Sequence, residues 1–288
     1  MDDQLFGGIE AGGTKFVCAV GTSPDTIISK TEIATTSPQE TLENVIAFFK
    51  EQPKVQAIGI ASFGPLDLDK QSSTYGYIKM TPKEGWRDVD LVGTISRGLN
   101  VPIALETDVN GAALAEQLYG AGKNLESIAY MTVGTGIGVG CITDSKILRG
   151  LTHTEMGHML IPHSAQDTNP MSTCPYHSNC LEGLASGTAL KKRWDISPEQ
   201  LSSTEAWDLE AQYLAFGIVN IITCIMPMRI IIGGGVMEHP GLIEDIRLKV
   251  PEIINGYISV PEINEYIVRP QLGTMSGVSG AIAIAAKA

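Results

Sequence analysis

The sequence has few basic residues and no run of them. Its 288 residues include 20 lysines and arginines against 32 aspartates and glutamates, which gives a formal net charge of −12. Because proteins that bind nucleic acids neutralise phosphates with basic side chains, this balance argues against a nucleic-acid surface. It does not argue against a nucleotide ligand, which helix N-termini, a few lysines and Mg²⁺ can hold.

The chain also lacks a long hydrophobic run and the marks of a secretory signal. Its longest apolar stretch, Leu214 to Met226, has 13 residues and contains Asn220, so we predict a buried helix and no membrane span. The first residues, MDDQLFGG, lack the basic-then-apolar order of a signal peptide. The five cysteines are an odd number, and we expect reduced thiols in a cytoplasmic protein.

Alternating apolar patterns predict an α/β fold, in one large domain or two of medium size. Strands are expected at 5–10, 15–20, 26–33, 55–61, 101–106, 127–133, 136–143 and 229–232, and helices at 38–51, 109–119, 204–226 and 277–287. The segments 62–88 and 162–180 have no clear period, and we predict long loops there.

Two glycine-rich segments, GIEAGGTK at 8–15 and TVGTGIGVG at 132–140, each separate two predicted strands. Either can be a tight hairpin or a phosphate site, because glycine leaves the backbone N–H groups accessible. Their similar surroundings suggest two related halves, although two unrelated hairpins would give the same pattern. Neither segment has the spacing of a Walker A or a dinucleotide-binding motif.

The segment LETDVNGAALAE places Asp108 between a predicted strand and a predicted helix. An aspartate there can cap the helix by accepting backbone N–H bonds. Open α/β sheets also bind ligands at the carboxyl ends of their strands, where an aspartate can accept a proton from a substrate hydroxyl. Position alone leaves both roles open.

A third set of residues has the spacing of metal ligands. Cys174, His177 and Cys180 follow one another at intervals of three, and His158 completes four nitrogen and sulfur ligands for a tetrahedral zinc ion. Glu155 lies three residues before His158, on the same face of a helix or turn. A polar loop with unligated thiols is one alternative, and the H-x-E pattern of zinc deaminases at 153–155 is another. Four protein ligands would leave no open position for a reactive water, which favours a structural ion.

Five motifs in order, GGIEAGGTKF, LETDVNGAALAEQ, TVGTGIGVG, EMGH and the CPYHSNC loop, resemble the ROK family of sugar kinases, and most of all its bacterial fructokinase branch. The resemblance implies an actin/hexokinase-like (ribonuclease H-like) duplicated fold, with two α/β domains and a central cleft. The smaller domain would comprise 1–115 and 276–288, and the larger one 116–275.

The resemblance also implies roles for individual residues. Asp108 would be the general base that takes the proton of the sugar 6-hydroxyl, with Mg²⁺ bridging the β- and γ-phosphates. ATP would be held by Gly12, Gly13, Thr14 and Lys15, by Gly134, Thr135 and Gly136, and by an adenine-side loop at Gly233 and Gly234. The sugar would contact Gly64, Thr107, Asp108, Glu155, His158 and Glu182, and structural zinc would bind His158, Cys174, His177 and Cys180.

Two departures from the family pattern concern residues of the first half. Glu10 stands where the family usually has an aspartate linked to Mg²⁺, and Thr107 stands where relatives often have an asparagine that contacts the sugar. The expected reaction is the conversion of D-fructose to fructose 6-phosphate by a homodimer, with no nucleic-acid or membrane partner. The alternatives are another hexose preference, as in a glucokinase or mannokinase, a non-catalytic sugar sensor, or a zinc hydrolase. Only seven residues precede Gly8, so we expect no DNA-binding helix-turn-helix.

Overall fold

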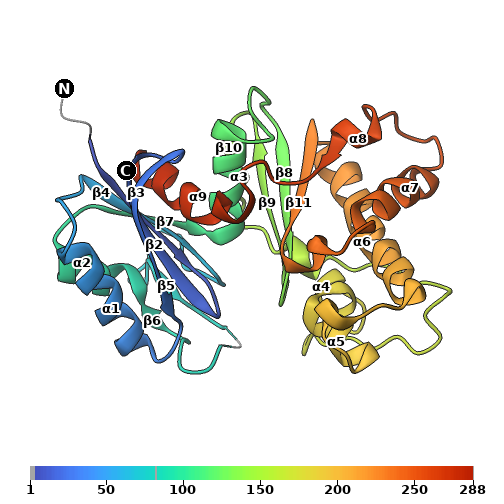
Figure 1. Cartoon of the computed structure of the whole chain (residues 1–288), viewed down its shortest axis with the longest axis horizontal. Helices are drawn as coiled ribbons and strands as arrows, with labels where there is room; N and C mark the ends of the chain where they lie inside the picture. Colours follow the sequence, from blue (N-terminus) through green and yellow to red (C-terminus); the bar gives the residue numbers. More distant parts are fainter. Residues whose placement is uncertain (1–3, 82, 288) are drawn as a thin grey trace. The chain divides into compact units, whose positions relative to one another are not determined.

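The computed structural model describes residues 4–81 and 83–287, which form two compact units (Figure 1). The first unit comprises the described residues up to Asn124, the segment Ile147–Thr154 and the residues from Gln271 onward. The second comprises Leu125–Lys146 and Glu155–Pro270. The boundary predicted after residue 115 falls inside helix α3 (Asp108–Tyr119) of the first unit.

A five-stranded sheet with the order β3-β2-β1-β4-β7 forms the centre of the first unit. Its strands are β1 (Phe6–Ala11), β2 (Lys15–Ser23), β3 (Thr26–Ala34), β4 (Ala57–Ser62) and β7 (Ile103–Thr107). Strand β1 pairs antiparallel with β2 and parallel with β4, which in turn pairs parallel with β7. All residues of β4 are buried, as expected for a central strand of a sheet that is covered on both faces.

The sheet of the second unit repeats this arrangement with the order β10-β9-β8-β11-β12. Its strands are β8 (Ile128–Val133), β9 (Ile137–Thr143), β10 (Lys146–Ile147), β11 (Arg229–Gly233) and β12 (Ile267–Val268). Strand β8 again pairs antiparallel with the next strand of the chain and parallel with β11, which pairs parallel with β12. The relation between the halves therefore extends from the two glycine hairpins to the whole sheets.

Helices cover both faces of the first sheet (Figure 1). Along β2, Phe16, Cys18 and Val20 pack in one cluster with α1 (Pro38–Lys50) and α2 (Leu91–Leu99). The alternate residues Val17 and Ala19 pack instead with α9 (Ser276–Ala285). Because side chains alternate across a strand, these two clusters lie on opposite faces.

Sequence analysis predicted α1 but not α2. Helix α1 has clear signals, since Pro38 is its first residue and the Ser37 hydroxyl accepts the Glu40 N–H at 3.3 Å. Helix α2 is short and contains two glycines, which are poor helix formers. The Asp90 carboxylate caps its first turn. The described residues of the preceding segment 62–88 contribute the short strand β5 (Tyr77–Ile78), which pairs with β6 (Val89–Asp90).

Helix α9 lies unusually close to β4 and to α3. A Cβ atom on Gly59 of β4 would lie 1.9 Å from the Ala281 carbonyl oxygen, and one on Gly280 would lie 2.1 Å from the Gly111 carbonyl oxygen. No side chain can occupy these positions without moving a helix backbone. Glycine at both positions therefore fixes the distance between the two helices and the sheet.

The second unit carries α4 (Leu181–Ala185), α5 (Gly187–Trp194), α6 (Thr204–Ile225), α7 (Leu242–Ile254) and α8 (Ile263–Tyr266). Short 3₁₀ turns occupy Met156–His158, Pro198–Gln200 and Gly235–Glu238, and a further one lies at Gly273–Met275 of the first unit. Sequence analysis predicted α6 to within one residue. It missed α7, whose interior contains Pro251, a residue that normally ends a helix.

By length and composition, α6 is the one helix among the described residues that is apolar enough to cross a membrane. It is also 56% buried over its most apolar window, and the buried side chain of Glu210 lies on it. A buried carboxylate and this degree of burial are typical of a core helix, in agreement with the sequence-based prediction.

We expect Gly59→Ala to destabilise the first unit by about 3 kcal/mol or more, since the added methyl group would force α9 away from the sheet. Gly150→Ala is the matched control, because a Cβ there meets nothing within 4 Å. We expect it to change stability by less than about 0.5 kcal/mol. Urea unfolding measures both values, and equal stabilities for the two variants would contradict this packing.

Candidate functional site

The first glycine hairpin, Gly12–Lys15, joins β1 to β2 and has an ordered, closed turn. The Gly12 N–H donates to the Lys15 carbonyl oxygen at 3.0 Å, and the Gly12 carbonyl accepts the Thr35 hydroxyl at 2.7 Å. Nothing lies within 4 Å of the position that a Gly13 Cβ would take, so a ligand can approach the backbone there. The Lys15 ammonium lies 2.8 Å from the carboxylate of exposed Glu32, which is on the neighbouring strand β3.

The second hairpin, Gly134–Gly136, joins β8 to β9 and is held by the start of α5. The Gly134 carbonyl accepts the Gly187 N–H at 2.7 Å, and the Thr135 carbonyl accepts the Thr188 hydroxyl at 2.7 Å. Space is again open at Gly134, where nothing lies within 4 Å of a Cβ position. The two hairpins thus share a glycine with open space beside it and hydrogen bonds that hold the turn, which are the properties that a phosphate site needs.

The predicted adenine-side loop lies at the carboxyl end of β11. Gly234 has a φ of +98°, and a Cβ there would lie 2.3 Å from the Val133 carbonyl oxygen. Glycine is therefore required at this position, both for its conformation and for the close approach to β8. Gly233 is the last residue of β11 and lies against Pro270.

Asp108 is the first residue of α3, and the residue that caps this helix is its neighbour Thr107. The Thr107 hydroxyl accepts the Asn110 N–H at 3.3 Å, while an Asp108 oxygen accepts the adjacent Val109 N–H at 2.8 Å. The helix therefore does not need Asp108 as its cap. Thr107 is 5% exposed, and its hydroxyl accepts this capping bond.

Glu10 shares this part of the first unit with Asp108. Burial, together with the negative charge of Asp108, raises the pKa of Glu10 to about 7. The Val278 N–H at the start of α9 donates to the Glu10 carboxyl, and a Cβ on Gly277 would lie 2.3 Å from the Glu10 carboxyl carbon. The absence of a side chain at Gly277 therefore makes room for the longer acid at position 10.

Gly64 and His153 lie together in the first unit. A Cβ on Gly64 would be 3.7 Å from the His153 ring, and His153 Nε2 accepts the Leu66 N–H at 3.1 Å. His153 is thus engaged by the backbone of the first unit and is not part of the Cys/His cluster of the second. The deaminase-like interpretation of residues 153–155 is therefore wrong.

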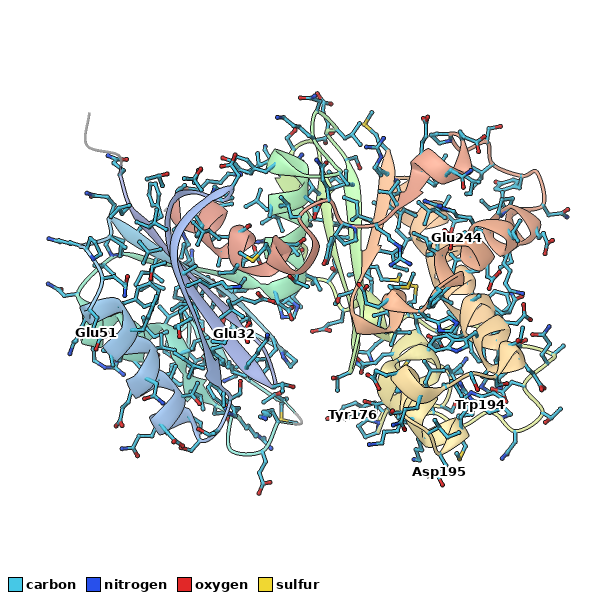
Figure 2. All side chains as sticks on the ribbon, viewed as in Figure 1. Glu32, Glu51, Tyr176, Trp194, Asp195 and Glu244 are labelled. Atoms are coloured by element: carbon cyan, nitrogen blue, oxygen red, sulfur yellow. The ribbon has the colours of Figure 1, made fainter. Side chains whose placement is uncertain are left out.

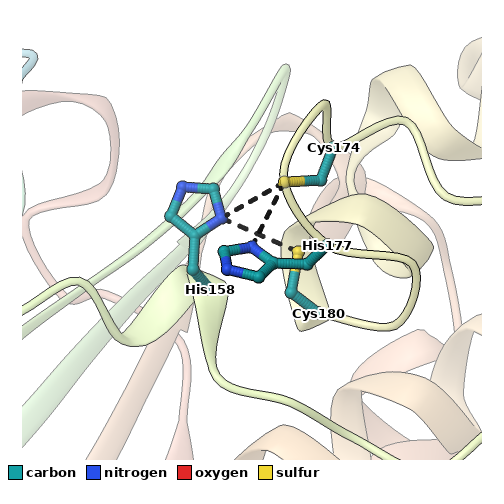
Figure 3. Close-up of side chains that lie close together, drawn as sticks. All are labelled: His158, Cys174, His177 and Cys180. Atoms are coloured by element: carbon teal, nitrogen blue, oxygen red, sulfur yellow. Dashed lines mark hydrogen bonds between the residues drawn. The ribbon is translucent and has the colours of Figure 1, made fainter. Parts of the chain in front are cut away.

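The four predicted zinc ligands come together in the second unit (Figure 3). The ligand atoms of His158, Cys174, His177 and Cys180 all lie within 4.8 Å of one another. Cys174 Sγ is 3.5 Å from His177 Nδ1 and 3.7 Å from His158 Nδ1, which is also 3.7 Å from Cys180 Sγ. Tyr176, between two of the ligands in sequence, is 73% exposed at the surface (Figure 2).

These distances fit a tetrahedral ion. With zinc–sulfur and zinc–nitrogen bonds of about 2.3 and 2.0 Å, sulfur and nitrogen ligands at the tetrahedral angle are about 3.5 Å apart. Burial raises the pKa of the Cys180 thiol to about 11, and a bound metal would reverse this by ionising the thiol. The donor set is that of a closed structural zinc site.

Glu182 links this cluster to the second hairpin. One of its carboxylate oxygens lies 3.8 Å from His158 Nε2, the ring nitrogen that does not face the thiols. The other accepts the Ile137 N–H at 3.0 Å, next to the hairpin. A carboxylate beside the second nitrogen of a metal-ligating histidine is a common way to fix the ring.

The EMGH motif forms the 3₁₀ turn that presents His158. Glu155 precedes this turn and is exposed, and its carbonyl accepts the His158 N–H at 3.0 Å. A Cβ on Gly157 would lie 1.9 Å from the Ile137 carbonyl oxygen, so glycine allows the turn to rest on β9. The motif thus holds one proposed zinc ligand at a fixed distance from the second hairpin.

Sequence analysis missed two further acids near Asp108. Glu106 pairs with Arg149, which is far away in sequence. Glu116 is fully buried, and its carboxylate accepts four hydrogen bonds at 2.7 to 3.1 Å, from the N–H groups of Ala121, Gln271 and Leu272 and from the Ser276 hydroxyl. The only sequence signal was an acidic residue on an otherwise apolar strand or helix.

Comparisons with known proteins agree with these features. The ROK family profile matches residues 6–288. A protein of Bacillus subtilis (strain 168) is 46% identical, over 99% of this chain and 96% of its own length. The fructokinase of Streptococcus mutans serotype c (strain ATCC 700610 / UA159) is 41% identical, over 99% of this chain and 98% of its own length.

The fold also matches that of a solved structure with bound ligands. It is the crystal structure of a ROK family glucokinase from Streptomyces griseus in complex with glucose and AMPPNP, with a TM-score of 0.78 and 25% identity. The match covers 99% of this chain and all of that chain. With a family match over nearly every residue and relatives this similar over their full length, the chain belongs to the ROK family.

Proposed function

We propose that this protein is an ATP-dependent hexose kinase that converts D-fructose to fructose 6-phosphate. The observation that carries the proposal is the position of Asp108 in a chain that matches a fructokinase over its full length. Asp108 lies where a strand ends and a helix begins, and Thr107 relieves it of the capping role. A carboxylate at such a position can serve a substrate.

In the proposed reaction, Asp108 takes the proton from the sugar 6-hydroxyl while that oxygen attacks the γ-phosphorus of ATP and ADP leaves. Phosphoryl transfer needs little covalent chemistry from the protein, so positioning and charge neutralisation supply most of the rate.

ATP would be held by the two hairpins, through the backbone at Gly12–Thr14 and at Gly134–Gly136, with the adenine near Gly233 and Gly234. Lys15 contributes to the first hairpin and is already paired with Glu32. Mg²⁺, when bound, neutralises charge on the β- and γ-phosphates. Glu10 fits the hard-cation preference for carboxylate oxygen. Its raised pKa would fall next to the cation, because a nearby positive charge favours the ionised form.

The sugar would be recognised by Glu155, His158 and Glu182, with Gly64 and Thr107 near the base. Charged and polar groups of this kind distinguish hexoses by the positions of their hydroxyls, since a wrong sugar leaves a polar group unpaired. We further propose that the enzyme is cytoplasmic and dimeric. All five cysteines are free thiols, and the family resemblance implies the dimer.

We predict that Asp108→Asn lowers kcat about 10²–10⁴-fold while fructose still binds, because the substitution removes the base and keeps the shape. Stability should change little, since Thr107 is the cap. Thr107→Ala is the control for stability and should cost about 1 kcal/mol. Steady-state kinetics and urea unfolding measure both variants, and an unchanged kcat for Asp108→Asn would remove the base from the proposal.

We also propose one structural zinc ion per chain, bound by His158, Cys174, His177 and Cys180. Elemental analysis of protein purified without chelator should find it, and Cys174→Ser should lose it. Cys224→Ser, which changes an exposed cysteine outside the cluster, should keep it. Because His158 belongs to both the metal and the sugar sites, removing the metal should raise the KM for sugar. Protein without zinc at full activity would contradict this.

The substrate assignment is tested by kcat/KM for fructose, mannose and glucose at saturating Mg·ATP, measured by ADP release. We expect fructose to be preferred, with some activity on mannose, because hexoses differ by the position of their hydroxyls. Glucose preferred by tenfold or more would make this a glucokinase. No ADP release with any hexose would favour the sugar sensor.

A further inference from the structure

A buried ion pair lies directly beside the proposed base. Glu106 is the residue before the helix cap Thr107, and it is 1% exposed. One of its carboxylate oxygens is bound by the guanidinium of Arg149. Arg149 is about half exposed, so in this pair the acid is buried and the base reaches water.

The second oxygen of Glu106 organises the junction between β7 and α3. It accepts the Thr107 N–H at 3.1 Å and the side-chain amide of Asn110 at 3.2 Å. These two donors lie on either side of Asp108 in sequence. The Glu106 carboxylate thus spans the first turn of the helix that begins with Asp108.

Arg149 belongs to a segment that returns briefly to the first unit. Residues 147–154 are part of that unit, although the chain before and after them belongs to the second. The segment has another attachment, the hydrogen bond between His153 and Leu66. Removing the Arg149 side chain should therefore leave the segment in place, so that any change in activity results from the lost positive charge.

We infer that Arg149 is a positioning residue for the phosphoryl transfer: it compensates the charge of Glu106, which in turn holds the Asp108 backbone in its active geometry. The inference rests on the proposed role of Asp108. A buried carboxylate without a partner is strongly unfavourable, so the junction would rearrange when Arg149 is removed. Displacing a reacting group by about 1 Å can cost about 10²-fold in rate.

Because Glu106 is buried and Arg149 is half exposed, replacing Arg149 should lower kcat more than replacing Glu106. Arg149→Met should lower kcat about 10- to 100-fold and change the KM for fructose less than about threefold, because Arg149 is not itself one of the proposed sugar contacts. Glu106→Gln should lower kcat by less than about fivefold, since glutamine keeps an acceptor for Thr107 and Asn110, and the half-exposed Arg149 is solvated. Arg149→Lys should retain part of the activity.

The double variant Arg149→Met/Glu106→Gln tests the cause. It should recover at least about tenfold in kcat over Arg149→Met, because no charge remains buried. Arg97→Met is the matched control: Arg97 pairs with Asp90 at the surface of the same unit, and its loss should leave kcat unchanged. Thermal unfolding of every variant shows whether each is folded at the assay temperature.

Two results would overturn the inference in an active enzyme: an Arg149→Met variant with the wild-type kcat, or a double variant no faster than Arg149→Met. A wild-type protein that phosphorylates no hexose contradicts the proposed function instead. In that case the coupling between Arg149 and Glu106, read as non-additive shifts in the unfolding midpoint across the same four proteins, still tests the ion pair. If the shifts in the unfolding midpoint of the two single variants simply add in the double variant, Arg149 and Glu106 are not coupled, and the ion pair is contradicted.

Discussion

The close approach of α9 to β4 and α3 is the constraint on which the first unit depends. Gly59 and Gly280 bring helix backbone against strand and helix backbone without an intervening side chain. Asp108 begins one of these helices, and the Glu10 carboxyl accepts a hydrogen bond from the first turn of the other. The same contact that closes the core thus determines where the two carboxyl groups lie.

Each buried acid around this contact is compensated in a different way. Glu116 accepts four hydrogen bonds, and Glu106 is paired with Arg149. Glu10 has only partial compensation, so burial and Asp108 raise its pKa to about 7. Strongly shifted pKa values are common at functional sites, because catalysis often requires an ionisable group in a buried position that is unfavourable for folding. The first unit thus keeps a partly compensated acid close to the proposed base.

Much of this architecture follows from the sequence, since strands, glycine hairpins and closely spaced metal ligands are local patterns. The Cys/His cluster was predictable because three of its members lie within CPYHSNC. The helix cap was not, because Thr107 and Asp108 are both good cap residues and only the backbone geometry distinguishes them. The pairing of Glu106 with Arg149 was not predictable either, since it depends on how residues 147–154 return to the first unit. Helix α7 was missed because a proline normally ends a helix, whereas Pro251 lies within the last turns of this one.

The central claim is that Asp108 and the residues around it transfer a phosphoryl group from ATP to the 6-hydroxyl of fructose. Phosphorus NMR of a reaction with Mg·ATP and fructose tests it most directly, because the spectrum identifies both the bond broken and the bond formed. The account predicts ADP and a single new phosphomonoester in equal amounts, with coupling to the protons on carbon 6. Unchanged ATP, or ADP with inorganic phosphate alone, would contradict it.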